Sequence, residues 1–204
     1  TGVAGGYLDS IPMLVLSGQV RYDTTARSTG LGIRALGDQE FDITKAVESM
    51  TKYCEMVVDP MRIRYCLEKA LYIAKSGRPG PCWLDIPLNV QGAYIDETEL
   101  VGFDAEEYEK ELASKQAEEQ ALAKAEGRAC VQESVRPEPV SEEVVREVLE
   151  RIKTAKRPVI YAGNGIRIAG AFDEFRSVIE KLNIPVVTGW DSIDLIEDEH
   201  PLYV

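Results

Sequence analysis

The stretch Asp9-Ser10-Ile11-Pro12-Met13-Leu14-Val15-Leu16-Ser17-Gly18-Gln19-Val20 decides how the rest of the chain is interpreted. Pro12 ends any helix that precedes it, because proline lacks an amide hydrogen and crowds the preceding turn. Residues 13–16 form a short continuous apolar run, which is typical of a strand buried on both faces of a parallel sheet. The segment Ser17-Gly18-Gln19 follows at the carboxyl end of this predicted strand.

The carboxyl ends of strands are where open α/β sheets bind ligands, so this segment is a candidate site. Gly18 allows a ligand to approach the backbone closely, and Gln19 offers both a hydrogen-bond donor and an acceptor. An ordinary turn after a buried strand accounts for the same residues, and both interpretations stay open.

A strand–helix–strand pattern follows in the first half of the chain. Residues 54–58 and 82–87 are expected to be strands, and Asp59-Pro60 is a typical helix start between them. Gly77 is expected to end this helix in the left-handed conformation. Asp42 is expected to cap a shorter helix, whose apolar face would consist of Ile43, Ala46, Val47 and Met50.

A second unit of the same kind is predicted in the last third of the chain. Ser141 caps a helix, and strands at residues 158–162 and 184–188 flank a helix at residues 169–182. The fold class is therefore α/β with parallel sheets. The predicted organisation is a first domain over residues 1–91, an acidic and partly helical connector over residues 92–140, and a second domain over residues 141–204.

Composition excludes several classes of protein. The 204 residues carry a net charge of −12, which argues against a nucleic-acid partner. Much of the excess lies in residues 96–126, which hold 11 acidic and 3 basic side chains and are expected to form a solvated surface or a disordered linker. No apolar run is long enough to span a bilayer. Both chain ends look cut, so a fragment of a longer protein is expected.

Cysteine usage indicates a reducing, cytoplasmic setting. The four cysteines (Cys54, Cys66, Cys82 and Cys130) form no C-x-x-C pair, and His200 is the single histidine. No metal site is therefore expected.

The turn Gly163-Asn164-Gly165 follows a predicted strand and precedes a helix, as in dinucleotide-binding folds. The third glycine of that pattern is missing, because Ile168 stands at its place, and no acidic residue ends the next strand. A plain turn is the favoured interpretation, and cofactor binding by Gly163 and Gly165 is the weaker one.

Five stretches together resemble the large-subunit family of acetolactate synthase, which consists of thiamine-diphosphate-dependent enzymes. They are residues 8–20, 37–40, 50–52, 76–87 and 157–165. The resemblance covers the chain apart from residues 102–139. It implies a partial parallel-sheet domain that binds the pyrimidine ring of thiamine diphosphate, followed by a partial Rossmann-like central domain.

The resemblance implies a cytoplasmic homodimer or homotetramer that uses thiamine diphosphate and Mg²⁺, with FAD as a further candidate cofactor. Such enzymes decarboxylate a 2-oxo acid and add the resulting enamine to an acceptor. The family's activating glutamate and its magnesium motif find no match here, so no catalytic residue is assigned and the chain alone is expected to be inactive.

By position in the family, Gln19 and Gln39 would face the substrate and cofactor, together with Gly18 and Asp38. A glutamine at position 39 that bonds to its own loop is the alternative. Arg21 replaces a proline usual in the family, and the residues near Asp38 suit a more polar acceptor, as in the branch linked to bacterial surface sugars. The rival function is a non-catalytic nucleotide-binding or regulatory module that uses the Gly163-Asn164-Gly165 turn.

Overall fold

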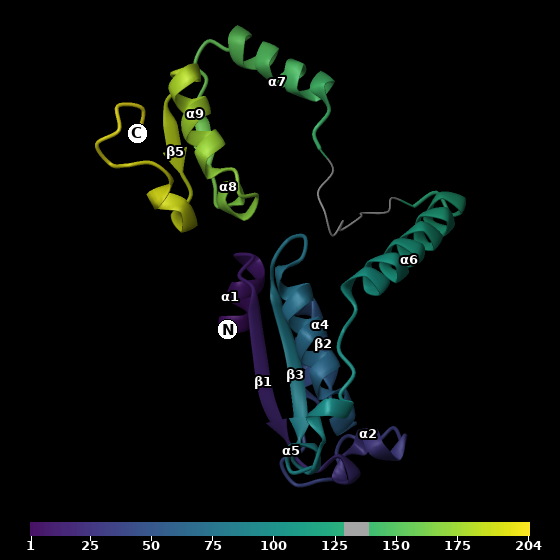
Figure 1. Ribbon diagram of the computed structural model, residues 1–204. Helices are drawn as coiled ribbons and strands as arrows, with labels where there is room; N and C mark the ends of the chain where they lie inside the picture. The colour runs from purple at the N-terminus through teal and green to yellow at the C-terminus, as the bar shows by residue number, and fades with distance from the viewer. Residues whose placement is uncertain (129–138) are drawn as a thin grey trace. The chain divides into compact units, whose positions relative to one another are not determined.

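The computed structural model describes residues 1–128 and 139–204 (Figure 1). Cys130 and residues 132–138 of the proline-rich connector lie outside the described residues. The chain divides into two compact units, Thr1–Pro137 and Glu138–Val204, and each is described by itself.

The first unit is built on a parallel sheet with the strand order β1-β3-β2. Its strands are β1 (Met13–Gln19), β2 (Tyr53–Met56) and β3 (Pro81–Pro87). Central β3 pairs with both neighbours in parallel, and the register places Ser17 opposite Asp85. The predicted α/β class with parallel strands is confirmed.

The prediction that the strand after Pro12 is buried on both faces is wrong. Within the described residues β1 pairs only with β3, and the Leu16 side chain is 55% exposed. The strand also runs on through Gln19, so the polar segment is part of the sheet. Central β3 is the strand that is buried over most of its length.

Helix α4 (Ile63–Lys75) connects β2 to β3 and covers the sheet. The Asp59 carboxylate accepts a hydrogen bond from the Met61 amide at 2.9 Å, and Pro60 opens a 3₁₀ turn that leads into the helix. Gly77 follows with φ of +55°, as predicted. The core between α4 and the sheet is formed by Val57, Cys66, Ala70, Ile73, Ala74, Cys82, Leu84 and Val90.

The other helices of this unit are short, except the last. They are α1 (Gly2–Leu8), α2 (Ala26–Thr29), α3 (Ile43–Val47), α5 (Leu88–Gln91) and α6 (Ala105–Ala125). Helix α3 buries Thr44 and Val47, while Ala46 is exposed, so the apolar face predicted for this segment is partly wrong. The Asp104 side chain caps acidic helix α6 by accepting hydrogen bonds from two amides.

An aromatic cluster attaches the start of α6 to α4. The Phe103 ring lies 5.5–5.6 Å from the rings of Tyr65, Tyr72 and Tyr108, measured between centroids. The Lys69 ammonium lies 4.8–5.6 Å from the ring centroids of Tyr53, Tyr65 and Tyr108. Cation–π attraction and ring packing therefore hold this part of the connector.

The second unit contains α7 (Glu142–Thr154), β4 (Ile160–Ala162), α8 (Gly165–Ile168), α9 (Phe172–Leu182) and β5 (Val186–Thr188). Strands β4 and β5 are parallel. The helix predicted at residues 169–182 begins later, at Phe172, because the chain first makes the single turn α8 and then passes through Gly170 with φ of +67°. Asn183 ends α9 in the left-handed conformation.

The apolar side chains of α7 lie open within the described residues. Val144, Val145, Val148 and Leu149 are 40–49% exposed. Among the helices that the structure describes, none is long and apolar enough to cross a membrane.

Candidate functional site

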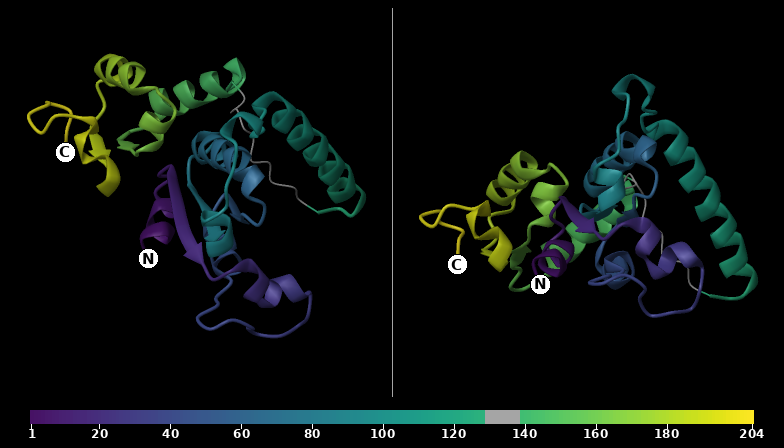
Figure 2. Two further views of the ribbon diagram at one scale, coloured as in Figure 1. Left: turned by 60° about the horizontal axis from the view of Figure 1, so that its bottom comes forward. Right: turned by 90° about the horizontal axis from the view of Figure 1, so that it is seen from below.

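The candidate site lies at the carboxyl ends of β1 and β3, where residues 20–42 form a long connection to α3. Figures 1 and 2 show this segment, with α2, continuing from the end of β1 near α5. The Tyr22 amide donates a hydrogen bond to Asn89 Oδ1 at 2.8 Å, which ties the start of the segment to α5.

Asp85 is the buried polar centre of this sheet edge, with no exposed surface. Ser17 Oγ donates a hydrogen bond to Asp85 Oδ1 at 2.6 Å, and Gln19 Nε2 donates one to Asp85 Oδ2 at 3.0 Å. Trp83 Nε1 donates in turn to Ser17 Oγ at 2.8 Å. Both carboxylate oxygens therefore act as acceptors, and Asp85 fixes two side chains of β1. The sequence analysis missed this residue, although an acid within an otherwise apolar strand is a recognisable signal.

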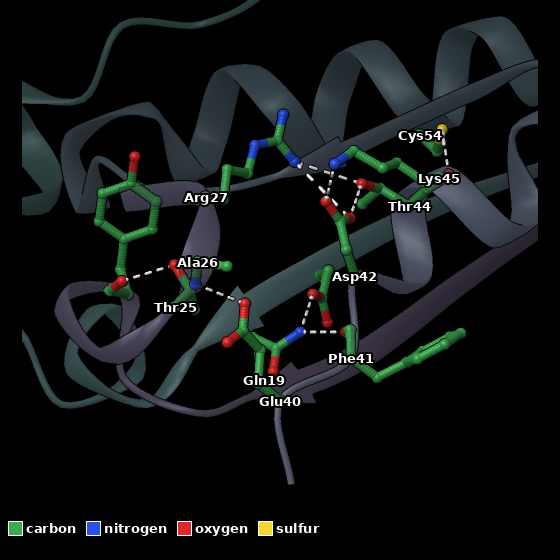
Figure 3. Close-up of polar contacts among 12 residues, drawn as sticks. Gln19, Thr25, Ala26, Arg27, Glu40, Phe41, Asp42, Thr44, Lys45 and Cys54 are labelled. Atoms are coloured by element: carbon green, nitrogen blue, oxygen red, sulfur yellow. Dashed lines mark hydrogen bonds and ion pairs between the residues drawn. The ribbon is translucent and has the colours of Figure 1, made fainter. Parts of the chain in front are cut away.

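Gln19 has its whole amide engaged within the chain. Besides its bond to Asp85, Nε2 donates to the Phe41 carbonyl oxygen at 2.6 Å (Figure 3). The other end of the amide, Oε1, accepts from the Val20 amide at 3.0 Å. Because both ends of the amide have partners, the side chain joins the sheet edge to the end of the 20–42 segment.

Glu40 holds two separate parts of the 20–42 segment together through hydrogen bonds to its carboxylate, and Figure 3 shows the contact with Ala26. Its Oε1 accepts a hydrogen bond from the Ala26 amide at 2.6 Å, and its Oε2 accepts from the amides of Leu36 at 2.7 Å and Gly37 at 3.2 Å. These bonds, that from Leu36 first, lower the pKa of Glu40.

Gly37 makes the close approach in this segment possible. A Cβ atom at this position would lie 2.6 Å from the Thr24 carbonyl oxygen, which is closer than packed atoms come. The absence of a side chain at Gly37 therefore allows this part of the segment to pack against the backbone at Thr24.

Asp42 anchors the end of the segment to α3 and α2. It accepts a hydrogen bond from Thr44 Oγ1 at 2.6 Å, and Lys45 Nζ and Arg27 Nη1 lie 3.3 and 3.8 Å from its oxygens. Burial opposes ionisation of this carboxyl, but the hydroxyl and the two cations outweigh it and lower the pKa of Asp42.

Gln39 and Asp38 stand out from this network. Both are exposed, and neither side chain forms a hydrogen bond or ion pair with any residue that the structure describes. Gln39 has φ of +60°, a left-handed conformation that costs a non-glycine residue roughly 1–2 kcal/mol. The alternative in which Gln39 bonds to its own loop does not occur in this structure.

Gly18 lies exposed on the same edge. A Cβ atom there would come within 3.2 Å of Gln91 Nε2, the end of a flexible side chain. The geometry therefore brings Gly18 and Gln19 to one edge and presents Asp38 and Gln39 on the segment beyond it.

In the second unit, the Gly163-Asn164-Gly165 turn connects β4 to α8. Neither glycine has a positive φ, and a Cβ atom at either position would meet nothing within 4 Å. Helix α8 is a single turn of four residues, too short to present the long helix N-terminus that binds a pyrophosphate.

The described residues also form a pocket of about 260 Å³ near the amino ends of the strands, lined by Tyr7, Leu8, Thr51, Lys52, Arg78 and Pro79. Its cations have partners within the chain: Lys52 Nζ donates to the Ile73 and Ser76 carbonyls, and Arg78 Nε donates to Ser10 Oγ. Residues 1–128 and 139–204 contain no group of three histidine, cysteine or acidic side chains placed to bind a metal ion.

Comparison with known proteins assigns the class. Residues 145–204 match the family of thiamine pyrophosphate enzyme central domains. Over 99–100% of its length the chain is similar to acetolactate synthase large subunits. It is 31% identical to that of Corynebacterium glutamicum over 207 residues, 30% to isozyme 1 of Escherichia coli and 29% to that of Lactococcus lactis, each over 202 residues.

The chain is therefore similar over nearly its whole length to acetolactate synthase large subunits, and its residues 145–204 match the central domain of thiamine pyrophosphate enzymes, which confirms the resemblance found in its sequence. It spans 27–29% of the length of these relatives.

Proposed function

We propose that the protein carrying this chain decarboxylates a 2-oxo acid and joins the product to an acceptor, and that residues 18–19 and 38–39 form one wall of its substrate site. The family match supports the use of thiamine diphosphate, which supplies the electron sink for decarboxylation when it is bound. Mg²⁺ and FAD belong to the same proposal, but no described residue is assigned to either.

The observation that carries the proposal is the conformation of Gln39. Its backbone is strained, its amide has no partner among the described residues, and hydrogen bonds hold Gly37 before it and Glu40 and Phe41 after it. Strain that the surroundings maintain is typical of residues that contact a ligand. The Gln39 amide can donate to a carbonyl or carboxylate oxygen of the acceptor.

The carboxylate of Asp38 supports a narrower chemical class for the proposed acceptor. An exposed carboxylate beside Gln39 repels a second 2-oxo acid and accepts hydrogen bonds from hydroxyl groups. We therefore propose a hydroxyl-bearing acceptor in preference to a second 2-oxo acid.

The proposal also includes a homo-oligomer in the cytoplasm. Four apolar side chains of the 20–42 segment are 43–64% exposed, namely Leu31, Ile33, Leu36 and Phe41, and exposed apolar surface that gathers in one region is typical of a protein interface. This supports a contact with a second subunit beside the site.

The test uses Gln39→Gly in the full-length protein, with the amount of coupled product per CO₂ released as the measurement. Glycine accepts φ of +60° without strain, so the variant should be about 1 kcal/mol more stable while it loses the amide. We expect CO₂ release to continue and the ratio of product to CO₂ to fall about tenfold, the effect of one lost hydrogen bond in the site.

The matched control is Asn183→Gly, which relieves the same left-handed strain at the end of α9, where no substrate-facing residue is predicted. It should gain stability with an unchanged product ratio. An unchanged ratio in Gln39→Gly would refute the proposed role of this residue.

A further inference from the structure

The Glu40 carboxylate connects two separate parts of the segment that carries Gln39. It draws together three backbone amides, at Ala26 and at Leu36 and Gly37. Figure 3 shows the Glu40 carboxylate directed toward the Ala26 amide from the far limb of the segment. Bonds from amides to a charged acceptor are among the stronger hydrogen bonds in proteins.

Gln39 lies between two fixed points. On one side, the Glu40 carboxylate holds the Leu36 and Gly37 amides, and Gly37 lies against the Thr24 carbonyl. On the other side, Gln19 Nε2 holds the Phe41 carbonyl oxygen at 2.6 Å. A residue between two anchored neighbours can be kept at φ of +60° although that conformation is unfavourable for glutamine.

We infer that Glu40 is a positioning residue: it closes the 20–42 segment and thereby holds Gln39 in the left-handed conformation with its amide turned away from the chain. Glu40 has all its described bonds to backbone amides of its own segment, so its effect on the acceptor passes through Gln39. This inference rests on the proposed function, and the experiment separates the two.

The first measurement concerns the loop alone and needs no activity. Arg34 is exposed within the segment that Glu40 closes, so trypsin cleavage of the Arg34–Ala35 bond reports opening of the loop. Glu40→Gln keeps the length of the side chain but replaces one accepting oxygen by a donor, so an amide loses its partner. In the full-length protein we expect about tenfold faster cleavage at this bond, measured by mass spectrometry of the released peptide.

The control variant is Glu48→Gln, which removes one negative charge from an exposed residue that has no partner in the described part of the chain. Its cleavage rate should equal that of the wild type. If Glu40→Gln fails to fold, Glu40→Asp retains the charge on a shorter side chain, and Gly37→Ala disturbs the same approach through its clash with Thr24.

The second measurement is the ratio of coupled product to CO₂ in a double-mutant cycle. Glu40→Gln alone should lower the ratio, as Gln39→Gly does. In the Gln39→Gly background, Glu40→Gln should cause no further fall, because the amide that Glu40 positions is already absent.

The cleavage rate and the product ratio together distinguish the inference about Glu40 from the proposed role of Gln39. Unchanged cleavage at Arg34 in Glu40→Gln overturns the inference, and so does a fall in the product ratio of equal size in both backgrounds. Faster cleavage with no further fall in the double variant supports it. An unchanged ratio in Gln39→Gly alone refutes the proposed role of Gln39 in the substrate site, and the cleavage rate by itself then shows whether Glu40 closes the 20–42 segment.

Discussion

Asp85 shows how one buried carboxylate can organise a sheet edge. It accepts hydrogen bonds from Ser17 and Gln19 on the neighbouring strand and has no exposed surface. A buried acceptor of this kind stabilises the fold only while its donors are present, since an unpaired polar group in the interior costs free energy.

Asp85→Asn should therefore destabilise the first unit by about 1–3 kcal/mol. The new amide group faces two donors and can accept from only one of them, so the hydrogen bond from either Ser17 or Gln19 is lost. Urea unfolding measures the change, with Asp9→Asn, an exposed acid of the same unit, as the control. A change as small as that of the control would show that the Asp85 bonds contribute nothing to stability.

The cysteines of the first unit should differ in reactivity. Burial raises the pKa of the Cys66 and Cys82 thiols to about 11, and neither side chain is exposed. At pH 8 about one thousandth of each thiol is ionised. Iodoacetamide should therefore label half-buried Cys54 well before the other two, and urea should remove the difference, as peptide mass spectrometry can show.

The raised pKa of the Cys66 and Cys82 thiols also predicts how the stability of the first unit changes with pH. A thiol that holds its proton more tightly in the folded state stabilises the fold fully below its ordinary pKa, and this contribution is lost as the pH rises toward 11. Equal labelling of Cys54, Cys66 and Cys82 in the native protein would contradict the burial of Cys66 and Cys82.

Among the elements, the attachment of α6 to α4 can be tested by Phe103→Ala. The ring contacts three tyrosines and is partly buried, so its loss should cost about 2 kcal/mol, less than the 3–5 kcal/mol of a fully buried phenylalanine. Tyr94→Ala removes an aromatic side chain that is completely exposed and should leave the unfolding midpoint unchanged. Equal midpoints in the two variants would refute this attachment.

Elements with local signals could be predicted from the sequence. The start of α4 at Asp59-Pro60 and the left-handed Gly77 after it depend on residues that act within one turn. The half-exposed state of β1 could not be predicted, because it depends on which strands are neighbours, and the paired residues of β1 and β3 lie 68 positions apart in the chain. In the second unit, the break at Gly170 was missed because the apolar spacing continues across it.

The candidate site was predictable only in part. Its edge followed from the position of Ser17-Gly18-Gln19 after a strand, and Gln39 came from the family resemblance. Asp85 was recognisable as an acid within an apolar strand, but its partner Ser17 lies 68 residues away, and the Ala26 partner of Glu40 lies 14 residues away, so no local pattern predicts these contacts. The engaged state of the Gln19 amide has the same origin, since its partner carbonyl belongs to Phe41.

At the scale of the whole molecule, five short stretches were enough to detect the similarity to acetolactate synthase large subunits. The domain boundaries predicted at residues 91 and 140 stay predictions.

The apolar face of α7 is open within the described residues, whereas a helix with this pattern gains most of its stability from burial of that face.

The two tryptophans give each unit its own optical reporter. Trp83 lies on central β3 with its indole N–H bonded to Ser17, whereas Trp190 in the second unit is 97% exposed. An indole in water emits at longer wavelength and is quenched readily by solutes such as acrylamide, while a shielded indole is protected from both effects. With Trp190→Phe, fluorescence follows the sheet that supports the candidate site, and with Trp83→Phe it follows the central-domain segment, so the melting of the two units can be recorded separately in one protein.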